Sequence, residues 1–135
     1  MIVKQVTVRV ENKEGKLKEV LDVLAEKQIN VEAISMADTV TRLILSNLEE
    51  VVTLLTENGF HAELTDVIRL TVPSRAGALA QMLSEIAAEK INLEYMYAFG
   101  SAEGDQMIIY PSDLKRTEEL LSGFEHTGGF EETIM

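Results

Sequence analysis

Two turns in the sequence carry residues that could bind a small ligand. Residues 10–17 and 72–79 each join an alternating apolar segment to an amphipathic one, and each contains a glycine. A turn that opens a helix leaves several backbone N–H groups unpaired at the positive end of the helix dipole. A carboxylate suits that position. Both turns therefore predict sites for a small anionic or zwitterionic molecule.

An asparagine follows each turn at the same spacing. Asn30 follows Gly15 in the sequence at the same distance at which Asn92 follows Gly77. An amide side chain offers a donor and an acceptor, which suits the carboxylate and ammonium groups of an amino acid. Glycine has no Cβ, so a ligand could reach the backbone at both turns. Together these residue types favour an amino acid as the ligand.

Each of these residues also has a structural interpretation. Asn12 and Ser74 could serve solely as caps of the helices that follow them, without any role in binding. Gly15 and Gly77 could be present solely to form the turns. The two asparagines could be present solely because a strand starts there. The two turns differ in sequence, so one of them could have lost binding. The sequence leaves these alternatives open.

The segments that position both turns form an internal repeat. A shift of 62 positions places residues 68–94 on residues 6–32 without a gap, and apolar positions keep their character. Such a repeat indicates one structural unit used twice. We expect two modules, residues 1–66 and 67–135. No proline-rich or low-complexity linker separates them, so they should sit side by side.

Alternating apolar residues predict strands, and apolar residues at helical spacing predict helices. In the first module we expect strands at 2–10, 30–36, 42–46 and 60–64 and helices at 16–28 and 49–57, the second ending at Asn58-Gly59. In the second module we expect strands at 67–72, 92–99, 106–110 and 130–134, a helix through Leu79 to Ile86, and a helix from 111 to about 123. Residues 42–46 align with 106–110 at a shift of 64, which makes the second hairpin two residues longer. This order is that of the ferredoxin-like split βαβ unit, so the predicted fold class is α+β, with two tandem ferredoxin-like βαββαβ modules.

Composition narrows the classes of partner and compartment. The 135 residues carry a net charge of −11, which disfavours nucleic acid as a partner. The chain has no cysteine, which excludes disulfides and thiolate chemistry. It shows no secretory signal and no apolar run near the ~20 residues that a membrane span needs. We therefore expect a soluble cytoplasmic protein without a membrane partner.

No constellation typical of catalysis is found. His61 and His126 are far apart and have no neighbours at ligand spacing, and the adjacent glutamate pairs are typical of solvated surface. We expect no catalytic residues, no metal and no cofactor. Tyr95, Tyr97 and Phe99 alternate along one strand and could stack on RNA, but the acidic composition argues against it. Packing on a neighbouring module or a dimer partner is the simpler interpretation.

The repeated turn resembles a known family. Residues 72–79, Val-Pro-Ser-Arg-Ala-Gly-Ala-Leu, with Ile-Asn-Leu at 91–93, resemble the ACT domain, a small-molecule-binding module of amino-acid metabolism. The family pattern is approximately Asp-Arg-Pro-Gly-x-Leu, followed later by Ile-Asn-Ile. Residues 10–17 and 29–31 match it as well, so the resemblance covers essentially the whole chain as two copies.

Both copies depart from the family pattern. Asn12 and Ser74 stand at its acidic position, and Glu14 and Ala76 stand at its proline. The resemblance implies that the turn of one module faces the second strand of its neighbour. The ligand-binding residues that it implies are Asn12, Gly15, Lys16, Leu17, Asn30, Val31, Ser74, Gly77, Ala78, Leu79, Asn92 and Leu93.

The expected function is regulatory and non-catalytic. By the resemblance, the protein binds a small ligand, an amino acid, at interfaces between ACT modules. The alternative is a constitutive regulatory subunit of an enzyme of amino-acid metabolism, with no functional ligand site. Because each module is near the size at which a lone core is marginal, we also expect a homodimer.

Overall fold

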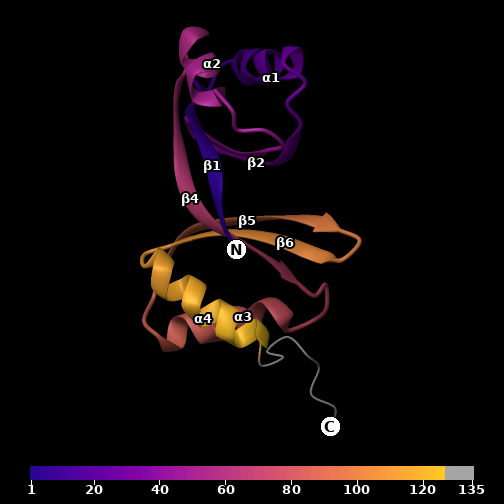
Figure 1. The fold of residues 1–135 in the computed structure, drawn as a ribbon, viewed down its shortest axis with the longest axis vertical. Helices are drawn as coiled ribbons and strands as arrows, with labels where there is room; N and C mark the ends of the chain where they lie inside the picture. The colour runs from indigo at the N-terminus through magenta and orange to yellow at the C-terminus, as the bar shows by residue number, and fades with distance from the viewer. Residues whose placement is uncertain (127–135) are drawn as a thin grey trace. The chain divides into compact units, whose positions relative to one another are not determined.

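The strands and helices follow the alternation and the helical spacing of the apolar residues. The structure is a computed structural model that describes residues 1–126, with side chains to residue 123. The strands are β1 (Ile2–Arg9), β2 (Val31–Ala37), β3 (Val40–Leu45), β4 (His61–Val72), β5 (Leu93–Ser101) and β6 (Gly104–Pro111). The helices are α1 (Lys16–Glu26), α2 (Val51–Glu57), α3 (Ala78–Ala88) and α4 (Leu114–His126) (Figure 1). The predicted α+β class is confirmed.

The chain divides into two units, each with its own core. The N-terminal unit is Lys4–Thr65, and the C-terminal unit combines Met1–Val3 with the chain from Asp66 onward. Two strands, β1 and β4, each run from one unit into the other. The sequence repeat gave no indication that Met1–Val3 belongs with the second module.

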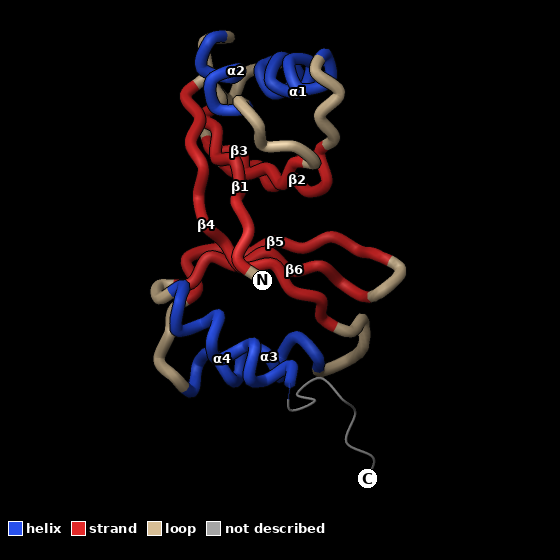
Figure 2. Tube along the Cα trace, in the orientation of Figure 1, coloured by secondary structure: helices blue, strands red, loops and turns tan. Residues whose placement is uncertain are grey.

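In the N-terminal unit, α1 and α2 cover one face of a sheet with the strand order β2-β3-β1-β4 (Figure 2). β1 and β3 are antiparallel, with Val6 opposite Leu43 and Val8 opposite Thr41. These four side chains are fully buried, and Leu24 of α1 belongs to the same core. The alternation along β1 therefore sets which face the helices cover.

In the C-terminal unit, the strand order is β5-β6-β4, and Met1–Val3 lies on the other side of β4. β4 and β6 are antiparallel, with Ile68 opposite Ile109 and Leu70 opposite Met107. These side chains are buried in a core that also contains residues of α3 and α4. The second copy of the repeat thus builds the same layered arrangement.

β4 is one continuous strand. We expected two strands, at 60–64 and 67–72, that meet at residues 65–66, and this expectation was wrong. No glycine or proline lies between His61 and Val72, so no residue forces the extended backbone to turn. The last strand of the first repeat therefore continues directly into the first strand of the second.

The two hairpins differ by four residues rather than by two. Leu70 pairs with Met107 as Val8 pairs with Thr41, so β6 follows β3 at a shift of 107 − 41 = 66. The expected shift of 64 was wrong. A slip of two residues keeps every side chain on its own face of the sheet, so the hydrophobic pattern could not detect the error. The turns are equally short, and the extra residues lengthen β5 and β6.

Local backbone conformation sets the ends of α2. Asn58 is the C-terminal cap and Gly59 follows with a φ of 89°, which confirms the predicted helix stop. The helix begins at Val51 rather than at residue 49, because Glu50 has a left-handed φ of 56°.

Two further expectations concern the ends of the chain and the membrane. The strand expected at 130–134 lies outside the described residues. Among the helices within residues 1–126, none is long and apolar enough to span a bilayer.

Candidate functional site

A left-handed glycine precedes both α1 and α3. Gly15 has a φ of 79° and Gly77 a φ of 87°, a conformation that costs other residues about 1–2 kcal/mol. Neither helix has a side-chain cap, so Asn12 and Ser74 do not cap them. A Cβ placed on either glycine would meet nothing within 4 Å. Backbone conformation therefore requires glycine at both positions, and the space beside each glycine is open.

Two backbone amides in the first turn of α1 are unpaired. The amide of Glu19 donates to the carbonyl oxygen of Gly15 over 3.1 Å. The amides of Leu17 and Lys18, which precede it, have no acceptor within the described chain. They are the unsatisfied donors that every helix start must direct to a side chain, water or a ligand.

The first turn of α3 repeats this arrangement. The amide of Gln81 donates to the carbonyl oxygen of Gly77 over 2.9 Å. The amides of Leu79 and Ala80 have no acceptor among residues 1–126. Both predicted turns therefore present two adjacent donors at the positive end of a helix dipole.

The turn before α1 carries charges of both signs. Glu11, Glu14 and Glu19 stand among its lysines. Lys13 Nζ lies 3.4 Å from a carboxylate oxygen of Glu11, and Lys16 Nζ lies 3.4 Å from one of Glu19. The acidic side chains therefore offset the positive field of the helix start.

The turn before α3 carries only positive charge. Arg75 is its one charged residue, since no carboxylate occurs in residues 73–84. Its Nη2 donates to Oε1 of Gln81, in the first turn of the helix, over 3.3 Å. The guanidinium group thus lies near the helix start and adds to the field of its dipole.

The asparagines lie at the far ends of the helices from the glycines. Asn30 donates its backbone N–H to Ser46 Oγ over 2.8 Å and accepts the Ser46 N–H over 2.9 Å. Asn92 and Ser112 repeat the pair at 3.0 and 2.8 Å. An 11-residue helix, about 16 Å long, separates Gly15 from Asn30. Within one unit the structure does not bring turn and asparagine together, although both asparagine side chains are exposed.

The other predicted site residues divide between surface and core. Leu17 packs at the edge of the N-terminal core, and Ala78 is buried in the C-terminal core. Leu79 is 39% exposed beside its unpaired amide. Those that are half-buried in the structure are Lys16, Val31 and Leu93. The first turn of α3 thus offers both polar and apolar contacts.

A pocket in the N-terminal unit was not predicted from the sequence. The pocket has a volume of about 490 Å³ and lies between the end of α1 and the start of α2. Its lining is Lys27, Ile29, Asn47, Glu49, Glu50, Thr53, Leu54 and Glu57. None of the predicted site residues lines it. Its polar groups come from separate segments without any motif spacing, so no pattern could have indicated it.

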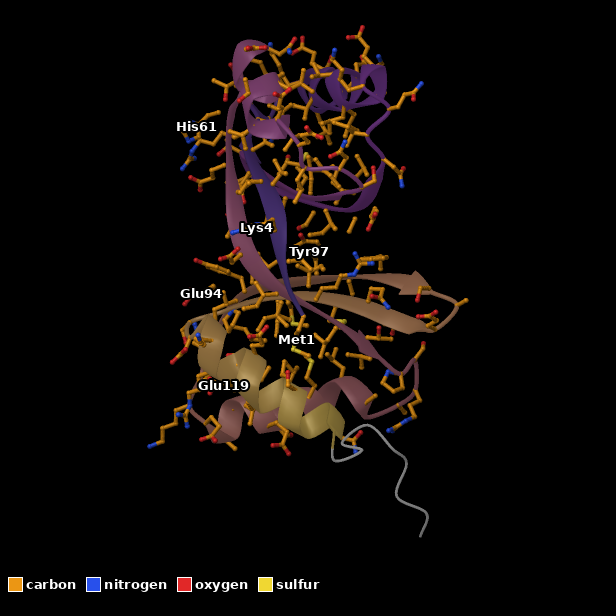
Figure 3. The ribbon with its side chains drawn as sticks, in the orientation of Figure 1. Met1, Lys4, His61, Glu94, Tyr97 and Glu119 are labelled. Carbon is orange, nitrogen blue, oxygen red and sulfur yellow. The ribbon has the colours of Figure 1, made fainter. Side chains whose placement is uncertain are left out.

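Within the described residues, the remaining candidate functional side chains do not form a site. His61 is exposed at the start of β4 (Figure 3). Within the described chain, no three His, Asp or Glu side chains are placed to hold a metal ion. The rings of Tyr95 and Tyr110 stack with centroids 5.0 Å apart, and the Arg69 guanidinium lies 5.3 Å from the Phe99 ring centroid. These aromatic side chains therefore have contacts within the C-terminal unit.

Comparison with known proteins identifies a family for nearly the whole chain. The family model of the ACT domain pair matches residues 1–123. The crystal structure of protein BT0572 from Bacteroides thetaiotaomicron is 34% identical and has a TM-score of 0.87, over 93% of this chain and 90% of that one. No curated protein matches the chain.

More distant structures share the fold. The regulatory subunit of aspartate kinase from Thermus thermophilus, in its ligand-free form, is 17% identical with a TM-score of 0.64, over 93% of this chain and 96% of that one. E. coli aspartokinase III in complex with lysine and aspartate is 19% identical with a TM-score of 0.61, over 96% of this chain and 32% of that one. At these identities the likeness shows the fold alone.

Proposed function

Because the chain belongs to the ACT domain pair family, we propose that it is a non-catalytic regulatory protein that binds an amino acid at the glycine turns of α1 and α3. The bound amino acid would favour one conformation, and a partner protein would respond to it. The observation that carries the proposal is the pair of unpaired amides in the first turn of each helix.

The chemistry of the turns suits a carboxylate. Its two oxygens can accept hydrogen bonds from two adjacent amides, and charge makes such bonds stronger than neutral ones. The open space beside Gly15 and Gly77 leaves room for the ligand backbone. At α3, the exposed Leu79 would contact an apolar side chain of the ligand.

The two turns are unequal, and the C-terminal one is the stronger site. Arg75 adds a positive charge there without any carboxylate in residues 73–84. At the N-terminal turn, Glu11, Glu14 and Glu19 repel an anionic group. The ligand therefore occupies the turn of α3 at lower concentration than the turn of α1.

The asparagines would act from a different module. In each unit the asparagine lies a full helix length from its own turn, so one ligand cannot touch both. Two copies of the chain in a homodimer could supply a turn and an asparagine to the same ligand. Asn30 and Asn92, with Val31 and Leu93, then form the second half of each site.

The partner is an enzyme of amino-acid metabolism. Of the similar structures, one is named as the regulatory subunit of aspartate kinase and another as an aspartokinase. The catalytic chain of an amino-acid kinase is therefore the first partner to test. The proposed location of both proteins is the cytoplasm. The same names support a second function, a constitutive regulatory subunit whose ligand sites are silent.

A thermal-shift screen against the twenty amino acids tests the ligand. At one hundred times its dissociation constant, a ligand adds about 2.7 kcal/mol of stability, a shift of several degrees. Ala80→Asp places a carboxylate at the unpaired amides of α3 and should abolish the shift. The unliganded protein should keep or slightly raise its Tm, because an acidic residue in the first turn stabilises a helix.

Ser84→Asp is the matched control. It adds the same charge to the same helix one turn further along, where the side chain is also exposed. It should keep the ligand-induced shift. A full shift in Ala80→Asp would exclude the turn of α3 as the site. No shift with any amino acid would refute the sensor and favour the constitutive subunit, for which a pull-down with the catalytic chain is the next test.

A further inference from the structure

The pocket between the end of α1 and the start of α2 has the size and the lining of a ligand site. Its volume of about 490 Å³ lies within the range of sites that bind small molecules. Ile29, which is 8% exposed, and the half-buried Leu54 give it an apolar part. Its charged residues are one lysine at the end of α1 and three glutamates in or just before α2, namely Lys27, Glu49, Glu50 and Glu57. The pocket therefore combines an apolar surface with charges of both signs.

The charges of the pocket do not pair across it. Among the described residues, no ion pair joins Lys27 to any of the three glutamates, and all four side chains are exposed. The lysine lies on the side of α1 and the glutamates lie on the side of α2. A ligand that contacts both sides must therefore carry an anionic group at one end and a cationic group at the other.

Helices α2 and α4 occupy corresponding positions but begin differently. The shift of 66 that relates β3 to β6 continues beyond the strands, because Ser46 and Ser112 each accept the backbone N–H of an asparagine. Glu50 therefore corresponds to Arg116. Arg116 lies in the first turn of α4, whereas Glu50 has a left-handed φ of 56° and precedes α2. The first turn of α4 has no helical counterpart before α2, and the pocket lies at that place.

In the C-terminal unit an ion pair joins the corresponding positions. Lys27 corresponds to Glu89 at the shift of 62, and each is the C-terminal cap of its helix. Nη2 of Arg116 lies 3.0 Å from Oε2 of Glu89 and joins α4 to α3. In the N-terminal unit the two charges are exchanged, as Lys27 and Glu50, and they form no pair. A ligand with a charge at each end could make the connection that the ion pair makes in the other unit.

We propose that this pocket binds a zwitterion whose carboxylate and cationic group stand at opposite ends of an aliphatic chain, as in a basic amino acid. The carboxylate contacts Lys27, the cationic group contacts Glu50, and the chain lies on Ile29 and Leu54. Three carboxylates outnumber one ammonium group in the lining, so a ligand with a net positive charge is favoured. Amino acids with apolar side chains do not fit, because one carbon separates their two charges. The site lies outside the glycine turns and does not rest on ligand binding there.

Amide NMR of the ¹⁵N-labelled full chain, titrated with L-arginine, tests the pocket. The amides of Lys27, Glu50 and Thr53 should shift together and saturate. Agmatine has the guanidinium group and the chain of arginine without its carboxylate, and L-norvaline has the carboxylate and the chain without the guanidinium group. Each should bind about fivefold more weakly than arginine, the effect of losing one exposed charge pair.

Two variants and a matched control locate the contacts. Glu50→Gln removes the partner of the guanidinium group and Lys27→Gln removes the partner of the carboxylate, so each should weaken arginine binding about fivefold. Glu26→Gln makes the same change of charge as Glu50→Gln on an exposed side chain outside the lining. It should bind arginine as the unaltered protein does.

Four results would overturn the proposal. No saturable shift of the pocket amides would exclude arginine from this site. Shifts confined to the turn of α3, at Leu79 and Ala80, would assign arginine to the glycine turns and leave the proposed function intact. Equal affinity for arginine, agmatine and norvaline would refute recognition at both ends. Unchanged affinity in Glu50→Gln and Lys27→Gln would refute the two contacts. Saturable pocket shifts with no amino acid bound at the glycine turns would support the pocket although the proposed function had failed.

Discussion

At the residue scale, glycines with a positive φ differ in what surrounds them. Gly59 and Gly104 have φ values of 89° and 132°. A Cβ on Gly59 would meet nothing within 4 Å, whereas a Cβ on Gly104 would lie 2.8 Å from the carbonyl oxygen of Val72. Only backbone conformation restricts Gly59. Conformation and contact with the neighbouring strand both restrict Gly104.

This difference predicts unequal losses of stability. Gly59→Ala should lower the free energy of unfolding by about 1 kcal/mol, the cost of a left-handed alanine. Gly104→Ala should lower it by about 3 kcal/mol, because backbone strain adds to a clash that backbone atoms cannot relieve. Urea denaturation of both variants measures the two losses. Equal losses would mean that the hairpin of β5 and β6 adjusts to the extra carbon.

The turn glycines could be predicted from the sequence, whereas the choice between capped and unpaired amides could not. Gly15 and Gly77 interrupt alternation just before a helical stripe, which indicates a turn. Asn12 and Ser74 are of types that often cap a helix, so the sequence left capped and unpaired amides as alternatives. Capping depends on backbone geometry three residues away, and here glycine takes the capping position instead.

At the scale of elements, the helices begin in different ways. α4 follows Asp113, whose Oδ1 accepts the backbone N–H of Arg116 over 3.1 Å. The hydroxyl and the amide of Thr117 both donate to the Asp113 carbonyl oxygen, over 2.6 and 3.1 Å. α3 has no such side chain, because Gly77 precedes it. The start of α4 is therefore closed by the chain itself, and the start of α3 is left for a ligand or water.

Substitution of the two possible capping residues should separate these cases. Asp113→Ala should lower the free energy of unfolding by about 1 kcal/mol, the usual loss of an N-terminal cap. Ser74→Ala should leave it unchanged, since Ser74 forms no cap. Thermal unfolding at one pH measures both. A loss in Ser74→Ala as large as in Asp113→Ala would show that Ser74 does support α3.

The elements themselves followed from the sequence, but their register and continuity did not. Periodicity gave the strands and helices because burial of one face imposes it. The slip in the second hairpin keeps that periodicity, so only the pairing of Leu70 with Met107 reveals it. The pocket between α1 and α2 depends on side chains from separate segments, which no local pattern connects.

At the scale of the whole molecule, charge is the dominant feature. The chain has 23 acidic and 12 basic residues. The described ion pairs are exposed, as in Lys18 with Asp22, 2.6 Å apart, and such pairs contribute little. Unpaired negative charges repel one another and destabilise the folded state. A partner that binds this protein through charge must therefore present a basic surface.

Salt should stabilise the protein. Raising NaCl from about 10 mM to about 150 mM shortens the screening length from roughly 30 Å to roughly 8 Å. The repulsion among carboxylates weakens, so Tm should rise by a few degrees. Differential scanning calorimetry at pH 7 measures the rise, and KCl should give the same value as NaCl. A fall in Tm would mean that attractive pairs outweigh the net repulsion.

The position of residues 1–3 has a consequence for the order of folding. The N-terminal unit is a contiguous segment, Lys4–Thr65, and can fold once it has left the ribosome. The contact between Met1 and Arg69 encloses the whole N-terminal unit in sequence, and closing so long a loop in an unfolded chain is slow. In the folded N-terminal unit, β1 and β4 are already neighbours, and the hydroxyls of Thr7 and Thr65 lie 3.0 Å apart. The first unit to be synthesised therefore presents residues 1–3 as a template on which the second unit assembles.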